Sequence, residues 1–225
     1  MKQKFEAPNH MKGRSIKKVA RLGDTRARVF IVESLSDRDE KLGRYDGRVL
    51  AEVLKICRKP PEYKYVRTKV ELRSAFEDFA RSDCRYLHLS CHADEVGIAT
   101  TQDDLSYEEL AELLGSSLSR RRLFVSACCA GTQEFAEMLD QRNIQMHSVV
   151  APVGSVPFSV SVAFWGAFYV RLFNIDRKKM SNAEIRTAIQ PLCDYFNEPF
   201  LFSRRRQSGK WKHEVISPES DPVTL

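Results

Sequence analysis

Apolar and polar positions alternate along this chain with two different periods. Short runs rich in β-branched and aromatic residues predict strands at 26–34, 64–69, 85–92, 121–127 and 146–154. Stretches with apolar residues three or four positions apart predict helices between them, at about 47–58, 70–83, 106–118 and 132–141. Because strand and helix follow one another in turn, the pattern indicates a parallel sheet with crossover helices.

The last third of the chain changes character. A long apolar segment and an amphipathic one predict two successive helices, at about 157–174 and 181–197. The spacing Ser-x-x-Glu at 181–184 is that of a capping box and marks the start of the second helix. We expect a terminal hairpin around residues 208–209 and a charged loop over LSDRDEKLGRYDG, residues 35–47.

Length and charge divide the chain into two parts. With 225 residues, 43% of them hydrophobic, it is long enough for one domain with a sizeable core. Seven Lys or Arg against Glu6 and Asp24 give residues 1–24 a charge of +5 out of the net +6, so we expect a basic arm at 1–24 and one domain at 25–225. Because no nucleic-acid-binding motif accompanies the charge, we interpret the basic ends as solvated, with at most a weak contact of the arm with nucleic acid or an acidic partner.

Three features bear on the cellular compartment. The segment 156–173 approaches membrane-spanning length but contains Gly166 and Arg171, so we interpret it as a buried helix and expect no membrane contact. The first residues, MKQKFEAPNHMKGRSIKK, are charged throughout, unlike a secretory signal. The six cysteines lack paired CxxC spacing, which favours free thiols over disulfides or metal ligands. Together these features predict a cytoplasmic protein.

Candidate chemistry lies at the ends of two predicted strands. LHLSCHADE places His92 where one apolar run stops, and LFVSACCAG places Cys128 and Cys129 where a later one stops. Functional groups of an open parallel sheet collect beyond the carboxyl ends of its strands. A single helix separates the two strands, so we expect the histidine and one cysteine to face each other across one edge of the sheet.

A cysteine and a histidine in this arrangement can form a nucleophile and its base. The thiolate is the reactive form of cysteine, and a neighbouring imidazole can take the thiol proton and later give one to a leaving amine. The competing interpretation is that each residue only packs. Side chains alternate along an extended strand, so only one of Cys128 and Cys129 can face His92, and the alternation alone leaves that choice open.

Two sequence boxes carry a resemblance to a known family. LHLSCHA and LFVSACCAG resemble the histidine and cysteine boxes of the caspase-like cysteine peptidases, above all of their CHAT branch. The segment 97–114 resembles the hairpin and helix that the family places between the boxes, and the stretch 151–189 contains segments that resemble its two following helices. The similarity covers about residues 26–195 and implies a three-layer α/β/α caspase-like fold with a mostly parallel central sheet.

The resemblance also implies a role for residues of the two boxes. Cys128 corresponds to the nucleophile, His92 to the general acid/base, and the backbone N–H groups of Ala93 and Cys128 to the oxyanion hole. The family usually has Gly-His-Gly where this chain has Cys91-His92-Ala93, so the N–H remains but the conformational freedom of glycine is lost. This chemistry needs neither a metal ion nor an organic cofactor.

Substrate specificity is predicted from charged residues near the boxes. In the resembled family, the loop after the first strand and the segments beside the boxes help to line the pocket for the residue before the cut. Acidic residues are in excess there, with Asp37, Asp39, Asp94 and Glu95 as the pocket candidates. An acidic pocket selects Lys or Arg, so we expect a basic residue before the cut.

The favoured interpretation is a cysteine endopeptidase that cleaves a protein partner through a thioester on Cys128. The resemblance suggests a prokaryotic regulatory or antiviral defence protease that needs an activating partner protein. Two alternatives stay open, namely a catalytically inactive caspase-like interaction module and a thiol hydrolase of small amides or esters. Selective labelling of one cysteine by a peptide electrophile supports an enzyme, whereas equal slow labelling of all six supports the interaction module.

Overall fold

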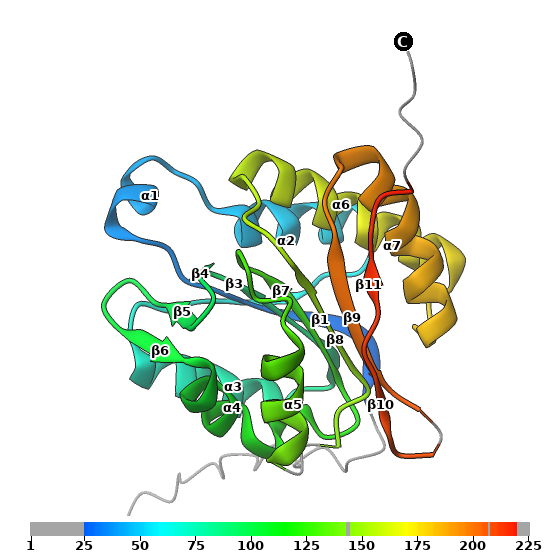
Figure 1. Cartoon of the computed structure of the whole chain (residues 1–225). Coiled ribbons are helices and arrows are strands. Elements are labelled where there is room, and N and C mark those ends of the chain that lie inside the picture. The colour runs from blue at the N-terminus through cyan, green and yellow to red at the C-terminus, as the bar shows by residue number, and fades with distance from the viewer. Residues whose placement is uncertain (1–24, 143–144, 207, 220–225) are drawn as a thin grey trace, which may run out of the picture.

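The computed structural model describes residues 25–142, 145–206 and 208–219, so the basic arm expected at 1–24 lies outside the described residues. An eight-stranded sheet forms its centre, with the order β10-β9-β8-β7-β3-β1-β2 and with β11 paired to β9 (Figure 1). The parallel strands are β1 (Arg26–Glu33), β2 (Glu62–Tyr65), β3 (Cys84–Ser90), β7 (Arg122–Ser126) and β8 (Ser148–Pro152). The strands β9 (Phe200–Arg205), β10 (Trp211–Lys212) and β11 (Val215–Ile216) extend the sheet through antiparallel pairs.

Helices cover both faces of this sheet, as Figure 1 shows. One face carries α2 (Asp46–Ile56), α6 (Phe158–Ile175) and α7 (Asn182–Phe196). The other carries α3 (Lys69–Arg81), α4 (Tyr107–Leu114), the 3-10 turn Gly115–Leu118 and α5 (Gln133–Gln141). Because the central strands are apolar on both sides, each face has its own buried core. The result is the parallel sheet with crossover helices that the alternating pattern predicts, in the three layers that the family resemblance implies.

Strand β3 shows how one run of residues serves both cores. Leu87 and Leu89 pack into the core beneath α3, α4 and α5, whereas Tyr86 and His88 face α6. His88 is 1% exposed, and its Nδ1 lies 3.3 Å from the Tyr169 hydroxyl. Burial lowers the pKa of His88 to about 3, so this histidine is a neutral core residue.

Two local differences from the sequence-based expectation lie next to the candidate site. The segment 35–47 contains a short helix, α1 (Asp37–Lys41), whose N-cap Ser36 accepts a hydrogen bond from the Asp39 N–H. Five residues are too few to show the apolar stripe by which a helix is recognised. Strand β3 ends at Ser90, and His92 begins a separate antiparallel sheet of β4 (His92–Ala93), β5 (Gly97–Ala99) and β6 (Asp104–Ser106).

The long apolar segment forms α6, a core helix. By length and composition alone α6 could cross a membrane, but Phe164, Trp165 and Phe168 are among its residues buried against the sheet, and the helix packs on α2 and α7. The predicted buried helix is thus present. The terminal hairpin expected around residues 208–209 also forms, as β9 and β10, with Gly209 in a positive-φ conformation (φ +81°).

Candidate active site

The order of the parallel strands creates a crevice at one edge of the sheet. From β1 the chain moves outward to β2 over one face, and from β3 it moves outward to β7 over the other face. Such a switch point is where open α/β sheets bind ligands. The segments that follow β1, β3, β7 and β8 meet there around a cavity whose walls include Asp46, His92, Cys128, Phe158 and Trp165.

His92 reaches this cavity from β4 and is held by a buried carboxylate. Its Nε2 lies 2.8 Å from Asp39 Oδ2, and its ring meets the Phe158 ring edge-on, with 5.5 Å between centroids. Asp39 also accepts hydrogen bonds from the Ser36 hydroxyl (2.5 Å) and an Arg44 N–H (3.0 Å). Burial raises the pKa of Asp39, but these three hydrogen bonds outweigh it and bring the pKa below its ordinary value. With an anion accepting at Nε2, the neutral ring keeps Nδ1 as its base.

Cys128 reaches the same cavity from the turn between β7 and α5. Its sulfur accepts hydrogen bonds from the Val156 N–H (3.4 Å) and the Ser155 hydroxyl (3.6 Å), and lies 3.7 Å from the Val156 carbonyl oxygen. The parallel pairing of β7 with β8 brings this segment alongside the cysteine. A half-buried thiol with donors directed at its sulfur therefore shares the cavity with His92.

The adjacent Cys129 is placed differently. Its backbone is left-handed (φ +56°), and its N–H donates to the Gly154 carbonyl at 3.0 Å. The residue lines a second hollow, together with Glu95 and Phe135. Burial is the largest cause that raises the pKa of its thiol, and the charge of the neighbouring Cys128 is the second largest. Of the two cysteines, Cys128 is the one that lines the cavity of the histidine.

The turn that presents Cys128 packs tightly against β8. The Gly131 N–H donates to the Pro152 carbonyl at 2.7 Å, and a Cβ at position 131 would lie 2.6 Å from that same oxygen. No side chain fits there, so the Cys-x-x-Gly spacing has a steric cause. Thr132 follows at once as the N-cap of α5 and accepts a hydrogen bond from the Phe135 N–H (3.1 Å).

The backbone N–H groups of Ala93 and Cys128 are both candidates for an oxyanion hole. Asp94 donates its N–H to the Gly97 carbonyl (3.0 Å), and hydrogen-bonded pairs alternate in an antiparallel ladder, so the Ala93 N–H points away from β5. Among the described residues, the Cys128 N–H has no acceptor. Ala93 lies in an extended strand and not at a positive φ, so alanine brings no backbone strain where the resembled family has glycine.

A second buried carboxylate lines the inner wall of the cavity. Asp46, the first residue of α2, is 6% exposed, and its two oxygens accept hydrogen bonds from the hydroxyls of Ser90 (2.5 Å) and Ser126 (3.0 Å). These serines are register partners on β3 and β7. The Ser161 hydroxyl of α6 lies 2.6 Å from that of Ser126. The carboxylate thus bridges the ends of two central strands below the histidine and cysteine segments.

Glu33, the last residue of β1, fixes the start of α2. Its carboxyl group accepts hydrogen bonds from the N–H groups of Gly47 (2.8 Å) and Arg48 (3.2 Å) and from the Tyr63 hydroxyl (2.5 Å). Burial raises the pKa of Glu33, and the hydrogen bond from Tyr63 lowers it by a smaller amount. The negative charge of Asp46 raises it again, so that the pKa is about 8. The Glu33 carboxyl group therefore holds the helix end that carries Asp46, and it binds its proton more tightly than an exposed glutamate does.

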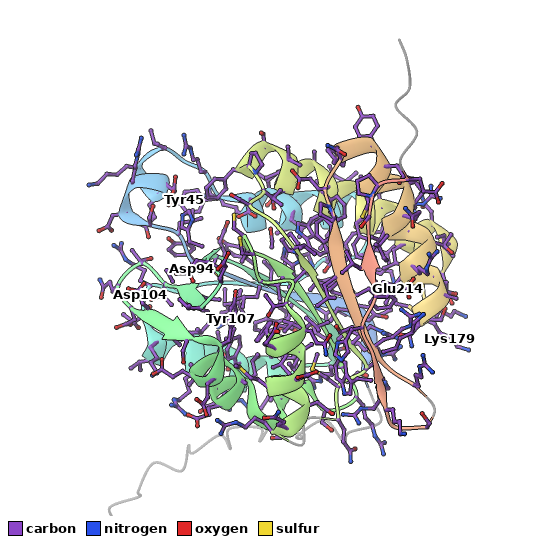
Figure 2. All side chains as sticks on the ribbon, viewed as in Figure 1. Tyr45, Asp94, Asp104, Tyr107, Lys179 and Glu214 are labelled. Atoms are coloured by element: carbon purple, nitrogen blue, oxygen red, sulfur yellow. The ribbon has the colours of Figure 1, made fainter. Side chains whose placement is uncertain are left out.

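The four acidic residues predicted for the substrate pocket lie elsewhere around the site. Asp37 pairs with Arg67 at 2.7 Å on the surface, and Asp39 holds the histidine. Asp94 accepts two backbone hydrogen bonds in the β4–β5 turn, where Figure 2 labels it, and Glu95 borders the hollow of the second cysteine. None of the four is among the residues that line the cavity between the histidine and Cys128. A carboxylate of the same acidic loop, Asp46, does line it, and the sequence did not single it out because its contacts with β3 and β7 are long-range.

Comparison with solved structures identifies the class of protein that shares this fold. No family model matches the sequence, and no curated protein matches it. The structure is similar to that of a secreted C11 cysteine protease from Bacteroides thetaiotaomicron in complex with an irreversible peptide inhibitor, with a TM-score of 0.54 at 11% identity over 79% of this chain and 66% of that chain. A second structure of such a protease from this organism, named iotapain, gives a TM-score of 0.52 at 11% identity over 80% and 66% of the two chains.

This chain therefore has the caspase-like fold of those C11 cysteine proteases, with a mostly parallel central sheet, and the predicted fold class is confirmed. It spans 66% of their length, just under two thirds. At 11% identity the similarity shows the fold alone. Membership of the CHAT branch stays a prediction from the sequence boxes.

Proposed function

We propose that this protein is a cysteine peptidase with Cys128 as nucleophile and His92 as general acid/base. The observation that carries the proposal is that these side chains follow separate strands and yet line one cavity, where Asp39 holds the imidazole. The fold shared with C11 cysteine proteases adds general support. A packing role accounts for a histidine such as His88, but it gives no reason for a carboxylate and imidazole pair beside a half-buried thiol.

The proposed reaction has two steps. Nδ1 of His92 takes the thiol proton, and the sulfur of Cys128 attacks the carbonyl carbon of the amide, so that a C–S bond forms and the carbonyl oxygen becomes an oxyanion. The N–H groups of Ala93 and Cys128 stabilise that charge. The oxyanion collapses to a thioester as the imidazolium gives its proton to the leaving amine. Water, deprotonated by His92, then hydrolyses the thioester and restores the thiol.

We further propose that the substrate carries Lys or Arg before the cleaved bond and that Asp46 receives this side chain. In the described part of the chain, the partners of the Asp46 carboxylate are two neutral hydroxyls and the neighbouring Glu33 carboxyl group, and none of them is a cation. A guanidinium or ammonium group that enters the cavity would add a charge-assisted hydrogen bond to this buried carboxylate. The basic preference expected from the sequence is retained, with a different carboxylate as its cause.

An activating partner protein is part of the proposal as well. The segment that follows β8 touches both reacting groups, since Val156 contacts the sulfur of Cys128 and Phe158 contacts the ring of His92. A partner that moves this segment would change access to both groups at once. The prokaryotic regulatory or defence role rests on the sequence resemblance, and the cytoplasmic compartment rests on the six cysteines, which lack paired spacing.

Covalent labelling with a peptide electrophile tests the proposal. The probe is a short peptide with Arg before an acyloxymethyl ketone, and a second probe carries Asp in place of Arg. Intact-mass analysis is expected to show one Arg-probe adduct on the wild type, none on Cys128→Ala and a full adduct on Cys129→Ala. The last variant is the matched control, because it removes a sulfur atom from the neighbouring residue.

Three results would count against parts of this proposal. A full adduct on Cys128→Ala with none on Cys129→Ala would reverse the choice of nucleophile. Equal slow labelling of all thiols would favour the inactive interaction module. Equal labelling by the two probes would leave the nucleophile in place but remove the role of Asp46 in specificity. Thermal unfolding of both variants near the wild-type midpoint shows that lost labelling is not lost folding.

A further inference from the structure

A second charged pocket lies at the opposite end of the sheet, where the parallel strands begin. It has a volume of about 500 Å³, between the amino ends of β1 and β3, the carboxyl end of α2 and the α6–α7 connection. Among the described residues, every charged side chain that lines this basic pocket is a cation, namely Arg26, Arg28, Arg58, Lys59, Arg85, Arg177 and Lys178. In Figure 2, Lys179 of the same connection lies on the side of the molecule away from Asp94 and Asp104.

Backbone oxygens hold several of these cations in place. The Nζ of Lys59 donates to the carbonyls of Ala27 (3.3 Å) and Arg177 (2.5 Å). The guanidinium of Arg85 donates to the hydroxyl of Thr25 (3.2 Å) and to its carbonyl oxygen. Carbonyl and hydroxyl oxygens orient a cation but carry only partial charge. The positive groups are therefore positioned without being neutralised.

Carboxylates neutralise only one corner of the basic pocket. Arg28 pairs with Asp83 at 2.6 Å, and Arg26 approaches the same carboxylate at 3.5 Å. The other five cations of the pocket form no ion pair with any residue that the structure describes. Asp176 adds a negative charge close to them, but its Oδ1 accepts two backbone N–H groups and forms no ion pair with a described cation. The pocket thus keeps a large excess of positive charge.

Repulsion among these charges affects the titrating groups nearby. Burial lowers the pKa of Lys59, and the charge of Arg177 lowers it further against a smaller effect of Asp176. Burial and then four surrounding arginines lower the pKa of His147, just before β8. The positive potential therefore extends along the amino ends of several strands. A bound anion would relieve this repulsion.

We propose that the basic pocket binds a ligand that carries several phosphate groups. Five of its seven cations are arginines, whose planar forks match the oxygens of phosphate in pairs. Its volume lies within the range of small-ligand sites, roughly 300–1,000 Å³, and a concave array favours a compact cluster of charge. The phosphates can belong to a free polyphosphorylated compound or to a nucleic acid strand. The proposal stands independently of peptidase activity, since the pocket lies at the other end of the strands.

Two probes and a pair of charge-matched variants test this proposal. Inorganic tripolyphosphate is titrated calorimetrically, and a short fluorescein-labelled single-stranded RNA is followed by anisotropy, both on the full chain at low salt. The pocket variant is Arg58→Gln/Arg177→Gln. The control, Lys41→Gln/Arg73→Gln, makes the same change in net charge at exposed positions outside the pocket. Thermal midpoints near that of the wild type show that both variants fold.

We expect the pocket variant to bind each probe that the wild type binds about tenfold more weakly or worse. The plot of log binding constant against log salt concentration should become less steep, by about one unit of slope for each cation removed. The control is expected to change binding less than about twofold. Tight binding of tripolyphosphate but not RNA assigns the pocket to a free polyphosphorylated ligand, and pocket-dependent RNA binding assigns it to a nucleic acid backbone. Binding of neither probe, or an equal loss in both variants, overturns the proposal.

Discussion

Asp39 and Asp46 lie close together in sequence but have different hydrogen-bond partners. The carboxylate of Asp39 accepts from a hydroxyl, an imidazole and a guanidinium, so its contacts suit it to hold and orient His92. The carboxylate of Asp46 accepts hydrogen bonds from two hydroxyls and lies next to the Glu33 carboxyl group, and none of these partners is a cation, so it can still receive a cationic side chain. Although both residues are aspartates, their different hydrogen-bond partners suit Asp39 to position the histidine and Asp46 to bind the substrate side chain.

Replacing Asp39 by Asn should slow the proposed reaction without weakening substrate binding. An amide has no negative charge to hold the Nε2–H of His92, so the ring loses its fixed tautomer and the kcat for an Arg peptide is expected to fall on the order of 100-fold, with KM within about threefold. Asp37→Asn, on the exposed side of the same helix, is the control and should keep kcat. A rise in KM with kcat unchanged would argue that Asp39 binds substrate instead.

At this scale the sequence predicts some residues and not others, for a physical reason. His92 and Cys128 stand where apolar runs stop, so a local pattern marks them. The contact of Asp39 with His92 joins α1 to β4, and the contacts of Asp46 join α2 to β3 and β7. Such contacts depend on strand order, which the local pattern does not contain. The sequence therefore offers Asp39 as a pocket residue, and it counts Asp46 only toward the acidic excess of the same loop.

The junction of β1 with α2 is the element on which the inner wall of the cavity depends. Glu33 at the end of the strand binds the first N–H groups of the helix, which places Asp46 at the helix start. Gly47 allows this close approach, since a Cβ there would lie 3.1 Å from the Glu33 carboxyl carbon. Strand end, helix start and buried carboxyl group thus form one unit.

Glu33→Gln should reduce the dependence of stability on pH. The folded-state pKa of Glu33 is about 8, above its ordinary value of 4.5, so the folded protein binds this proton more tightly than the unfolded chain. The contribution is fully present below pH 4.5, and the free energy of unfolding falls as the pH rises from there towards 8. From about pH 5 to 8, the wild type is expected to lose on the order of 1–3 kcal/mol more than the variant.

Urea unfolding at both pH values measures this difference. Glutamine keeps an acceptor for the Gly47 N–H, and its amide N–H can donate to the Tyr63 hydroxyl once that hydroxyl rotates to accept. Only the longer hydrogen bond from the Arg48 N–H is lost, so the variant is expected to fold. Glu52→Gln, on the exposed side of α2, is the control and should follow the wild type. Parallel pH profiles for wild type and Glu33→Gln would show that Glu33 titrates near its ordinary pKa.

Among the elements, length decides what the sequence reveals. The helices with capping boxes and apolar stripes, such as α4 and α7, form where the pattern predicts them. The five-residue α1 and the two-residue β4 have no periodicity to detect, and both carry residues of the candidate site. The expected strand 85–92 therefore runs past its true end at Ser90 and includes the histidine that belongs to the next strand.

For the whole molecule, the parallel sheet gives the two ends of the strands different chemistry. The carboxyl ends carry the cysteine, histidine and carboxylates, and the amino ends carry the basic pocket. The alternation of strand and helix predicts a parallel sheet with crossover helices, the family resemblance implies its three layers, and this fold is confirmed. The sequence does not predict the basic pocket, because residues 1–24 carry +5 of the net charge of +6 and the charges of the remaining residues nearly cancel. Its arginines come from distant segments that only the fold brings together.

Deleting residues 1–24 should preserve both the proposed peptidase site and the basic pocket. The eight-stranded sheet and both cores are built from described residues beyond the arm, and the cations of the basic pocket begin at Arg26. We therefore expect a thermal midpoint within about 2 °C of the wild type, unchanged cleavage of a small peptide and tripolyphosphate affinity within about threefold. RNA affinity is expected to drop more, because the seven Lys or Arg residues of the arm can contact phosphates, and the drop should shrink at high salt. Calorimetry and anisotropy on the two chain lengths measure these quantities, and a midpoint lowered by more than about 10 °C would mean that the arm contributes to the core.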